Sequence, residues 1–145
     1  MKVSDVITSK GSTEVFTIAP DAPISDLLDE LAEHNIGALV VCEDERRLVG
    51  IVSERDVVRK LRGISDPTSQ PVSSIMTTDV HTCAPEDSIT AMLETMTNLR
   101  IRHVPVISED GDLVALLSIG DAVKYRMQQL KFERDQLNQY VASAR

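Results

Sequence analysis

The sequence predicts an α/β (α+β) protein that is built from two copies of one small unit and ends in a long helix. Moving the sequence by 65 residues places residues 15–58 on residues 80–123 without a gap, and many side chains coincide or keep their character. The apolar residues of each copy follow the periods of short strands and amphipathic helices. Between Gly120 and Tyr140 the chain contains no further glycine or proline, which favours one continuous helix.

Composition restricts the class of protein. The chain has 145 residues, 42% of them hydrophobic and 26% charged, which is typical of a folded soluble domain. A formal net charge of -8 and 3% aromatic residues disfavour a nucleic-acid-binding face and base-stacking platforms. No apolar run approaches the ~20 residues that span a bilayer, and the N-terminus does not resemble a signal peptide. We therefore expect a cytoplasmic protein whose partners are neither nucleic acid nor membrane.

Each copy is expected to fold in the order strand, helix, strand, strand, helix. In the first copy, residues 15–18 are a short β-prone run, and the apolar residues that follow recur at helical spacing. Residues 38–41 and 48–52 are two apolar runs around a polar turn, which predicts a hairpin of buried strands. Ser53 has the position of a helix N-cap, and Asp56 lies three residues further. Because one unit leaves an apolar face uncovered, we expect the two copies to pack as a pseudo-two-fold pair.

Composition also predicts the boundaries of these units. We place the first unit at residues 1–64, a polar and proline-bearing linker at 65–71, the second unit at 72–126 and a helical extension at 127–145. Around the start of the extension and along it, apolar residues follow steps of three and four residues: Val123, Met127, Leu130, Leu137 and Val141. Two interpretations stay open, namely a helix docked on its own domain and a helix that packs against a second subunit.

The repeated unit, and above all the run G-I-V-S-E-R-D at residues 50–56, resembles the cystathionine β-synthase (CBS) domain. The motif of that family is G-h-x-[ST]-x-x-D, where h is apolar, and it closes the second strand of the hairpin and opens the last helix. Two tandem units without an attached enzyme resemble the stand-alone CBS pairs. Those proteins bind adenosyl compounds in two pseudo-symmetric clefts between the units, and they are regulators.

The resemblance implies a regulatory sensor of an adenine nucleotide, AMP above all, with no required cofactor and no catalytic residue. Ligand binding would change the geometry between the units or within a dimer. It also implies a homodimer formed through CBS packing and the C-terminal helix, together with an unidentified protein target. The alternative function is a protein interaction or oligomerisation module whose nucleotide site is vestigial.

The side chains of the motif suit a nucleotide chemically. A helix N-terminus offers free backbone N–H groups, and Ser53 adds a hydroxyl there. Arg55 adds a forked cation that matches phosphate oxygens. Asp56 can accept two hydrogen bonds from a ribose diol. Ser53 and Asp56 can also be an ordinary capping box, so a structural role remains open for both residues.

The two clefts are expected to be unequal. On the middle strand of the second copy, Arg102 and His103 replace Gly37 and Ala38, although a surface arginine beside a core histidine is the alternative. The stronger site is expected to contain Ile51, Ser53, Arg55, Asp56, Val80, His81, Thr82, Arg102 and His103. The weaker site is expected to contain Val15, Thr17, Gly37, Ala38, Ser118 and Asp121. Its facing strand carries no cation, so a di- or triphosphate would lack charge compensation there.

Other site chemistry is not expected. Cys42 and Cys83 align with apolar strand positions, which indicates small buried hydrophobes. The three histidines lack the spacing and companions of a ligand set, so no metal site is predicted. A hydrolase triad of Ser53, His103 and Asp56 would lack a nucleophile elbow and an oxyanion motif. We therefore expect no enzymatic activity.

Overall fold

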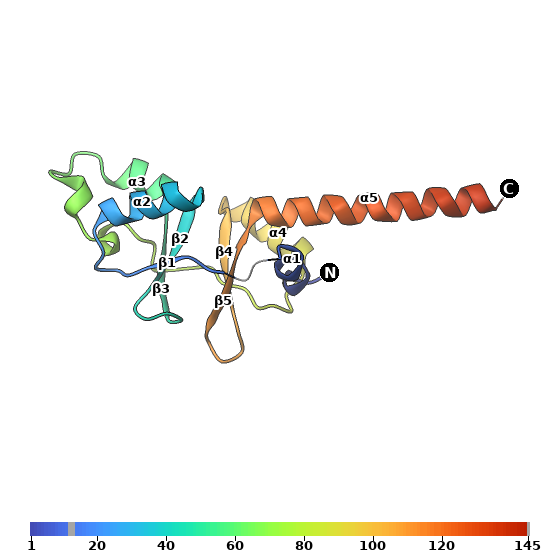
Figure 1. Ribbon diagram of the computed structural model, residues 1–145, viewed down its shortest axis with the longest axis horizontal. Coiled ribbons are helices and arrows are strands. Elements are labelled where there is room, and N and C mark those ends of the chain that lie inside the picture. Colours follow the sequence, from blue (N-terminus) through green and yellow to red (C-terminus); the bar gives the residue numbers. More distant parts are fainter. Residues whose placement is uncertain (12–13, 145) are drawn as a thin grey trace.

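The computed structural model describes residues 1–11 and 14–144. Two units lie side by side, and a long helix projects from the second one (Figure 1). In chain order the elements are α1 (Val3–Ser9), β1 (Thr17–Ile18), α2 (Ile24–His34), β2 (Ala38–Cys42), β3 (Leu48–Ser53), α3 (Glu54–Lys60), the short 3-10 helices η1 (Pro67–Ser69) and η2 (Val72–Ser74), α4 (Ile89–Leu99), β4 (His103–Ile107), β5 (Leu113–Ser118) and α5 (Ile119–Ser143). The mixed α/β class, the two hairpins and the long C-terminal helix agree with the sequence prediction.

The first unit contains a three-stranded sheet in the order β1-β2-β3. Strand β1 is parallel to β2, and β2 is antiparallel to β3. All residues of the central strand β2 are buried, as its unbroken apolar sequence predicts. Ala38 at the start of β2 pairs with Ser53 at the end of β3, which brings the N-cap of α3 beside the first residues of β2. The site described below lies at this end of the sheet.

The second unit has a two-stranded sheet of β4 and β5. The first strand expected in this copy is reduced to a single parallel bridge between Cys83 and Val106. The residue that aligns with Val40 of the first unit is Pro105, which lacks the N–H group that would donate to the carbonyl of His81. The parallel ladder therefore stops after one bridge.

The N-terminal segments of the two units are exchanged between their cores. Val3 and Val6 of α1 are buried in the core of the second unit, although α1 precedes the first unit in the chain. Val72 and Ile75, which follow the linker, are buried in the core of the first unit. Each unit therefore completes its core with the chain segment that precedes the other unit.

A third apolar cluster joins the two sheets, and Val40, Cys42 and Leu113 are its buried members. Both cysteines are buried, with 4% of Cys42 and 6% of Cys83 exposed. Burial raises the pKa of the Cys42 thiol and raises the pKa of the Cys83 thiol to about 12. Their expected role as small buried hydrophobes is confirmed.

Helix α5 covers its own unit only near its N-terminal end. Ala122 is its buried residue, and every residue in the range 130–144 is exposed. Figure 1 shows the distal half extending beyond the body of the molecule. Docking on its own domain therefore does not account for the apolar stripe of the distal half. Among the described residues, no helix combines the length and apolar character needed to cross a membrane.

Gly50 lies where β3 is closely approached by the chain that follows η2. The neighbouring Ile51 exchanges two backbone hydrogen bonds with Thr77, at N···O distances of 3.0 and 2.8 Å. A Cβ atom on Gly50 would lie 2.9 Å from the carbonyl oxygen of Thr77 and 2.9 Å from the sulfur of Met76. Because the carbonyl is held by the exchanged hydrogen bonds, it cannot move away without loss of that pairing.

We expect Gly50→Ala to lower the free energy of unfolding by about 1–3 kcal/mol, the usual cost of an added methyl group in a packed region. Urea unfolding followed by far-UV circular dichroism would measure the change. Gly120→Ala is the matched control, because a Cβ there would meet nothing nearer than 3.9 Å. Equal stability of the two variants would contradict the close approach at Gly50.

Candidate functional site

The end of β3 and the first turn of α3 hold the side chains of the repeated motif. The backbone N–H of Ser53 donates to Oδ2 of Asp56 at 2.9 Å, and the Ser53 hydroxyl accepts from the Asp56 N–H at 3.4 Å. Oδ1 of Asp56 lies 3.0 Å from Nζ of Lys60, four residues further along the helix. The capping box considered from the sequence is therefore present. The Asp56 side chain, 15% exposed, also reaches the wall of a cavity.

This first cleft has a volume of about 480 Å³ and lies between the two units. It collects eight of the nine residues expected for the stronger site: Ile51, Ser53, Arg55, Asp56, Val80, His81, Arg102 and His103. Thr82 is the expected residue that does not line the cavity. Gly37 and Ala38, which we expected in the weaker site, line this cleft as well as the second one.

Five lining residues of the first cleft were missed by sequence reasoning: Glu54, Thr77, Asp79, Arg100 and Ile101. Arg100 caps the end of α4 with a left-handed backbone, φ 57°, and Asn35 caps α2 in the same way at φ 51°. The repeat alignment pairs these two positions, so it carried a signal for this cap. With Arg55 and Arg102, Arg100 gives the cleft three exposed guanidinium groups.

His103 lies at the wall between the two clefts and lines both of them. A Cβ on Gly37 would lie 3.6 Å from the Cε1 atom of His103. The imidazole ring of His103 therefore packs over Gly37, which has no side chain of its own. Burial lowers the pKa of His103, and the nearby charge of Arg102 lowers it further, against the smaller opposite effects of Asp121 and Glu54. The imidazole ring is thus within the electrostatic influence of the first turns of both α3 and α5.

The second cleft is smaller, with a volume of about 330 Å³. It collects five of the six residues expected for the weaker site: Val15, Gly37, Ala38, Ser118 and Asp121. Thr17 is absent from its lining, and its backbone pairs with Val40 in the sheet. The Ser118 hydroxyl donates to Oδ2 of Asp121 at 2.8 Å and accepts from the Asp121 N–H at 3.1 Å. The first turn of α5 thus repeats the side-chain capping seen at α3.

The second cleft contains a cation that was not expected from the sequence. Its facing strand carries no cation, but Lys10 reaches the cleft from the end of α1, and its Nζ lies 2.7 Å from Oδ2 of Asp121. Burial acts to raise the pKa of Asp121, yet hydrogen bonds from Lys10 and Ser118 outweigh it and hold the pKa below its usual range. Lys10 was missed because it precedes the gap-free repeat.

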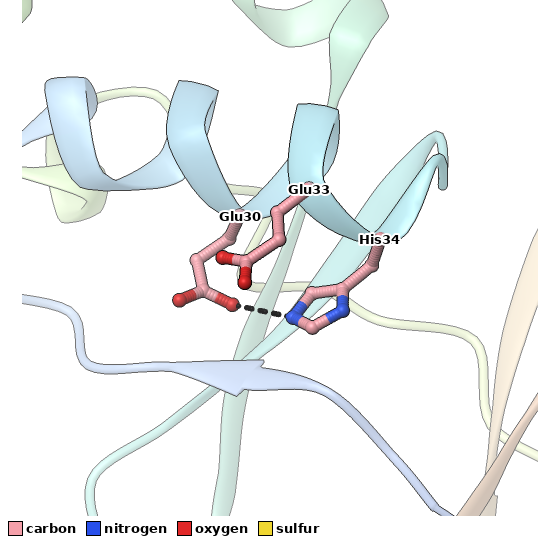
Figure 2. Close-up of side chains that lie close together, drawn as sticks. All are labelled: Glu30, Glu33 and His34. Atoms are coloured by element: carbon pink, nitrogen blue, oxygen red, sulfur yellow. Dashed lines mark hydrogen bonds and ion pairs between the residues drawn. The ribbon is translucent and has the colours of Figure 1, made fainter.

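A cluster at the end of α2 was also missed. Figure 2 shows Glu30, Glu33 and His34, whose ligand atoms lie within 4.8 Å of one another. Only cysteine and aspartate were considered as companions of histidine in the sequence, so these glutamates were not predicted to lie near it. Nε2 of His34 lies 3.0 Å from Oε2 of Glu30, and the ring of His34 stacks on Phe16 with centroids 3.7 Å apart. The cluster is therefore explained by an ordinary i, i+4 pair of Glu30 and His34 on the surface of α2.

Comparison with known proteins places both units in one family. The CBS domain family matches residues 3–63 and 72–128. A solved CBS-domain protein from Agrobacterium tumefaciens is 38% identical and covers 87% of this chain and 99% of its own, with a TM-score of 0.80. A CBS domain protein from Pyrobaculum aerophilum, solved in complex with AMP, is 28% identical and covers 83% of this chain and 89% of its own, with a TM-score of 0.74.

A curated relative belongs to the same family. The mitochondrial CBS domain-containing protein of Arabidopsis thaliana is 34% identical over an alignment that covers 96% of this chain and 71% of that protein. The family match spans nearly the whole chain in two consecutive units, and the structural neighbours are covered almost end to end. The chain therefore belongs to the CBS-domain family, as a tandem pair of CBS units.

Proposed function

We propose that this protein is a regulatory module that binds an adenine nucleotide, AMP above all, in the first cleft. One observation carries the proposal. The carboxylate of Asp56 from the first unit and the cation of Arg102 from the second unit line the same cavity of about 480 Å³. That volume lies within the range of small-molecule sites. The AMP complex of the Pyrobaculum aerophilum relative supports the same ligand class.

The chemistry of the lining divides into three parts. We assign the ribose to Asp56, because its carboxylate can accept hydrogen bonds from both hydroxyls of the diol. Arg55 and Arg102 would hold the phosphate, since guanidinium groups make charge-assisted, paired hydrogen bonds to phosphate oxygens. Ile51 and Val80 offer aliphatic walls for the base. The recognition of the base would rest largely on backbone groups beside these walls.

The regulatory step follows from the position of the cleft between units. A ligand that contacts both Asp56 and Arg102 couples the two units, and it favours whichever relative orientation it binds more tightly. A protein target that distinguishes those orientations would respond to the ligand through that difference in affinity. We propose no catalytic residue, no metal and no required cofactor for this activity.

A second candidate function is an oligomerisation module with a vestigial nucleotide site, and α5 is the observation that favours it. Its exposed apolar residues recur at steps of three and four residues, as in helices that pair side by side. A shallow groove runs along the same face and is lined by Val123, Met127 and Leu130. A homodimer formed through CBS packing and α5 would cover this face, and both functions can coexist in such a dimer.

A thermal-shift panel would test the nucleotide function first. The ligands are AMP, ADP, ATP, NAD, NADH and S-adenosylmethionine, with an extrinsic dye because the chain has no tryptophan. A ligand at 100 times its dissociation constant stabilises a protein by about 2.7 kcal/mol, so we expect AMP to raise Tm by about 5–10 °C. Calorimetry should then give one strong site per chain. Absence of a shift with every ligand would leave the oligomerisation function as the better explanation.

A further inference from the structure

The two clefts differ in what binds the aspartate of their motif. In the first cleft, the carboxylate of Asp56 is bound by Ser53 and by Lys60 of its own helix. In the second cleft, Asp121 is bound by Ser118 and by Lys10, which is far away in the sequence. The repeat alignment places Tyr125 of α5 at the position of Lys60. Helix α5 therefore has no lysine at the position that pairs with the aspartate in α3.

Lys10 is held in place by the structure of the N-terminal segment. It is the C-cap of α1, and its backbone N–H bonds to carbonyl groups of the last turn, among them that of Val6 at 3.2 Å. Val3 and Val6 anchor α1 in the core of the second unit, to which Asp121 also belongs. The Lys10 backbone and the Asp121 carboxylate are thus fixed to the same body, so the ion pair does not depend on the orientation of the first unit.

The repeat also shows that a lysine at this place is not a general feature of the fold. Residues 3–8 of α1 align with residues 72–77, and this alignment puts Lys10 opposite Asp79. Asp79 lines the first cleft, whereas Lys10 lines the second. Equivalent positions therefore bring an anion to one cleft and a cation to the other.

We propose that Lys10 acts as a latch on the second cleft, because it pairs with the Asp121 carboxylate from inside that cleft, whereas Lys60, which pairs with Asp56, does not line the first cleft. This inference rests on the proposed function, in which the equivalent Asp56 carboxylate binds ribose. Because Lys10 lines the cleft, a nucleoside that binds the Asp121 carboxylate must displace the ammonium group or bind beside it. Displacement is feasible, since 38% of the Lys10 side chain is exposed to solvent. The latch thus lowers the affinity of the second cleft without closing it permanently.

Adenosine is the suitable probe, because it carries the ribose diol but no phosphate that could attract the lysine. The Asp56→Ala variant silences the first cleft, and Lys10→Met is then added to it. Methionine has nearly the length of lysine but neither its charge nor its donors. We expect adenosine affinity, measured by calorimetry, to rise about threefold to fivefold in the double variant, in proportion to the loss of one partly exposed ion pair.

Lys124→Met in the same background is the matched control. Lys124 also contributes positive charge near Asp121, but among the described residues no hydrogen bond joins it to that carboxylate. We expect this variant to change adenosine affinity less than twofold. An NMR titration of the Asp121 carboxyl group gives a readout without ligand: its pKa should rise in Lys10→Met, because hydrogen bonds from Lys10 hold it down.

The outcomes separate the latch from the proposed function. Equal adenosine affinity with and without Lys10 overturns the latch, and so does an equal gain in the Lys124 control. Absence of adenosine binding in every variant also overturns it, since a latch needs a site to close. If the wild-type chain binds no adenine compound but Lys10→Met gains a site, the latch stands and the proposed function fails. If the wild type binds one AMP and Lys10→Met changes nothing, the proposed function stands alone.

Discussion

Asp56→Ala is expected to weaken AMP binding by about a hundredfold or more while the two-unit fold persists. The proposed role of this carboxylate is to accept two hydrogen bonds from the ribose, and each bond to a charged acceptor contributes about 1.5–3 kcal/mol. The Ser53 hydroxyl, which donates to Asp56 at 3.2 Å, loses this partner in the variant and offers the ribose only a weaker, uncharged acceptor. Titration calorimetry with AMP on the wild type and the variant measures the change, and the thermal shift should disappear in parallel.

The structural role of Asp56 must be separated from its role in binding. Asp56 accepts a hydrogen bond from the backbone N–H of Ser53, and loss of such a cap costs about 1 kcal/mol of stability. Asp5 provides the matched control, since it accepts a hydrogen bond from the backbone N–H of the N-cap residue Lys2 at 2.8 Å, as Asp56 does from Ser53. Asp5→Ala should lose comparable stability and keep its AMP affinity. Unchanged AMP affinity in Asp56→Ala would remove the carboxylate from the site.

Leu137→Glu is expected to convert a homodimer into a monomer, because it places a charge in the middle of the apolar stripe of α5. The side chain of Leu137 is 61% exposed in the single chain, so the substitution has no core to disrupt. In a dimer paired through α5, the same carboxylate would be buried against apolar side chains without a partner, which is strongly unfavourable. Light scattering at tens of micromolar should show a change from twice the chain mass to the chain mass of 16.0 kDa.

The control for this variant places the same charge on the opposite face of the helix. Gln139 is exposed and lies outside the stripe, so Gln139→Glu should remain a dimer. If Leu137→Glu is also a dimer, packing of the CBS units alone holds the two chains together. A wild-type mass of 16.0 kDa at the same concentration would contradict the homodimer itself.

The elements that could be predicted from the sequence are those governed by local periodicity. The apolar spacing that begins at Ile24 and at Ile89 predicted α2 and α4, and each helix begins at that residue. The polar turn after β2 predicted the hairpin, and the N-cap at Ser53 was identified from residue type and spacing. The reduction of the strand near Cys83 was not predicted, because it depends on Pro105, which lies in the pairing partner.

The candidate site likewise contains residues that could be predicted from the sequence and residues that could not. Site residues inside the gap-free repeat could be transferred from one copy to the other, and most of the residues expected in this way line the clefts. Thr82 was expected to line the site together with Val80 and His81, but only the latter two residues line the cavity. Lys10 could not be found, because its position depends on the packing of α1 against the opposite unit. Such exchange of segments leaves no local pattern in the sequence.

Helix α5 can also work as a lever arm. Its first turn contains Asp121 at the wall of the second cleft, and its 25 residues correspond to a rod about 38 Å long. A tilt of about 5° at the cleft would displace the far end by about 3 Å. The helix would thereby amplify a small adjustment around a ligand into a mechanical signal far from it.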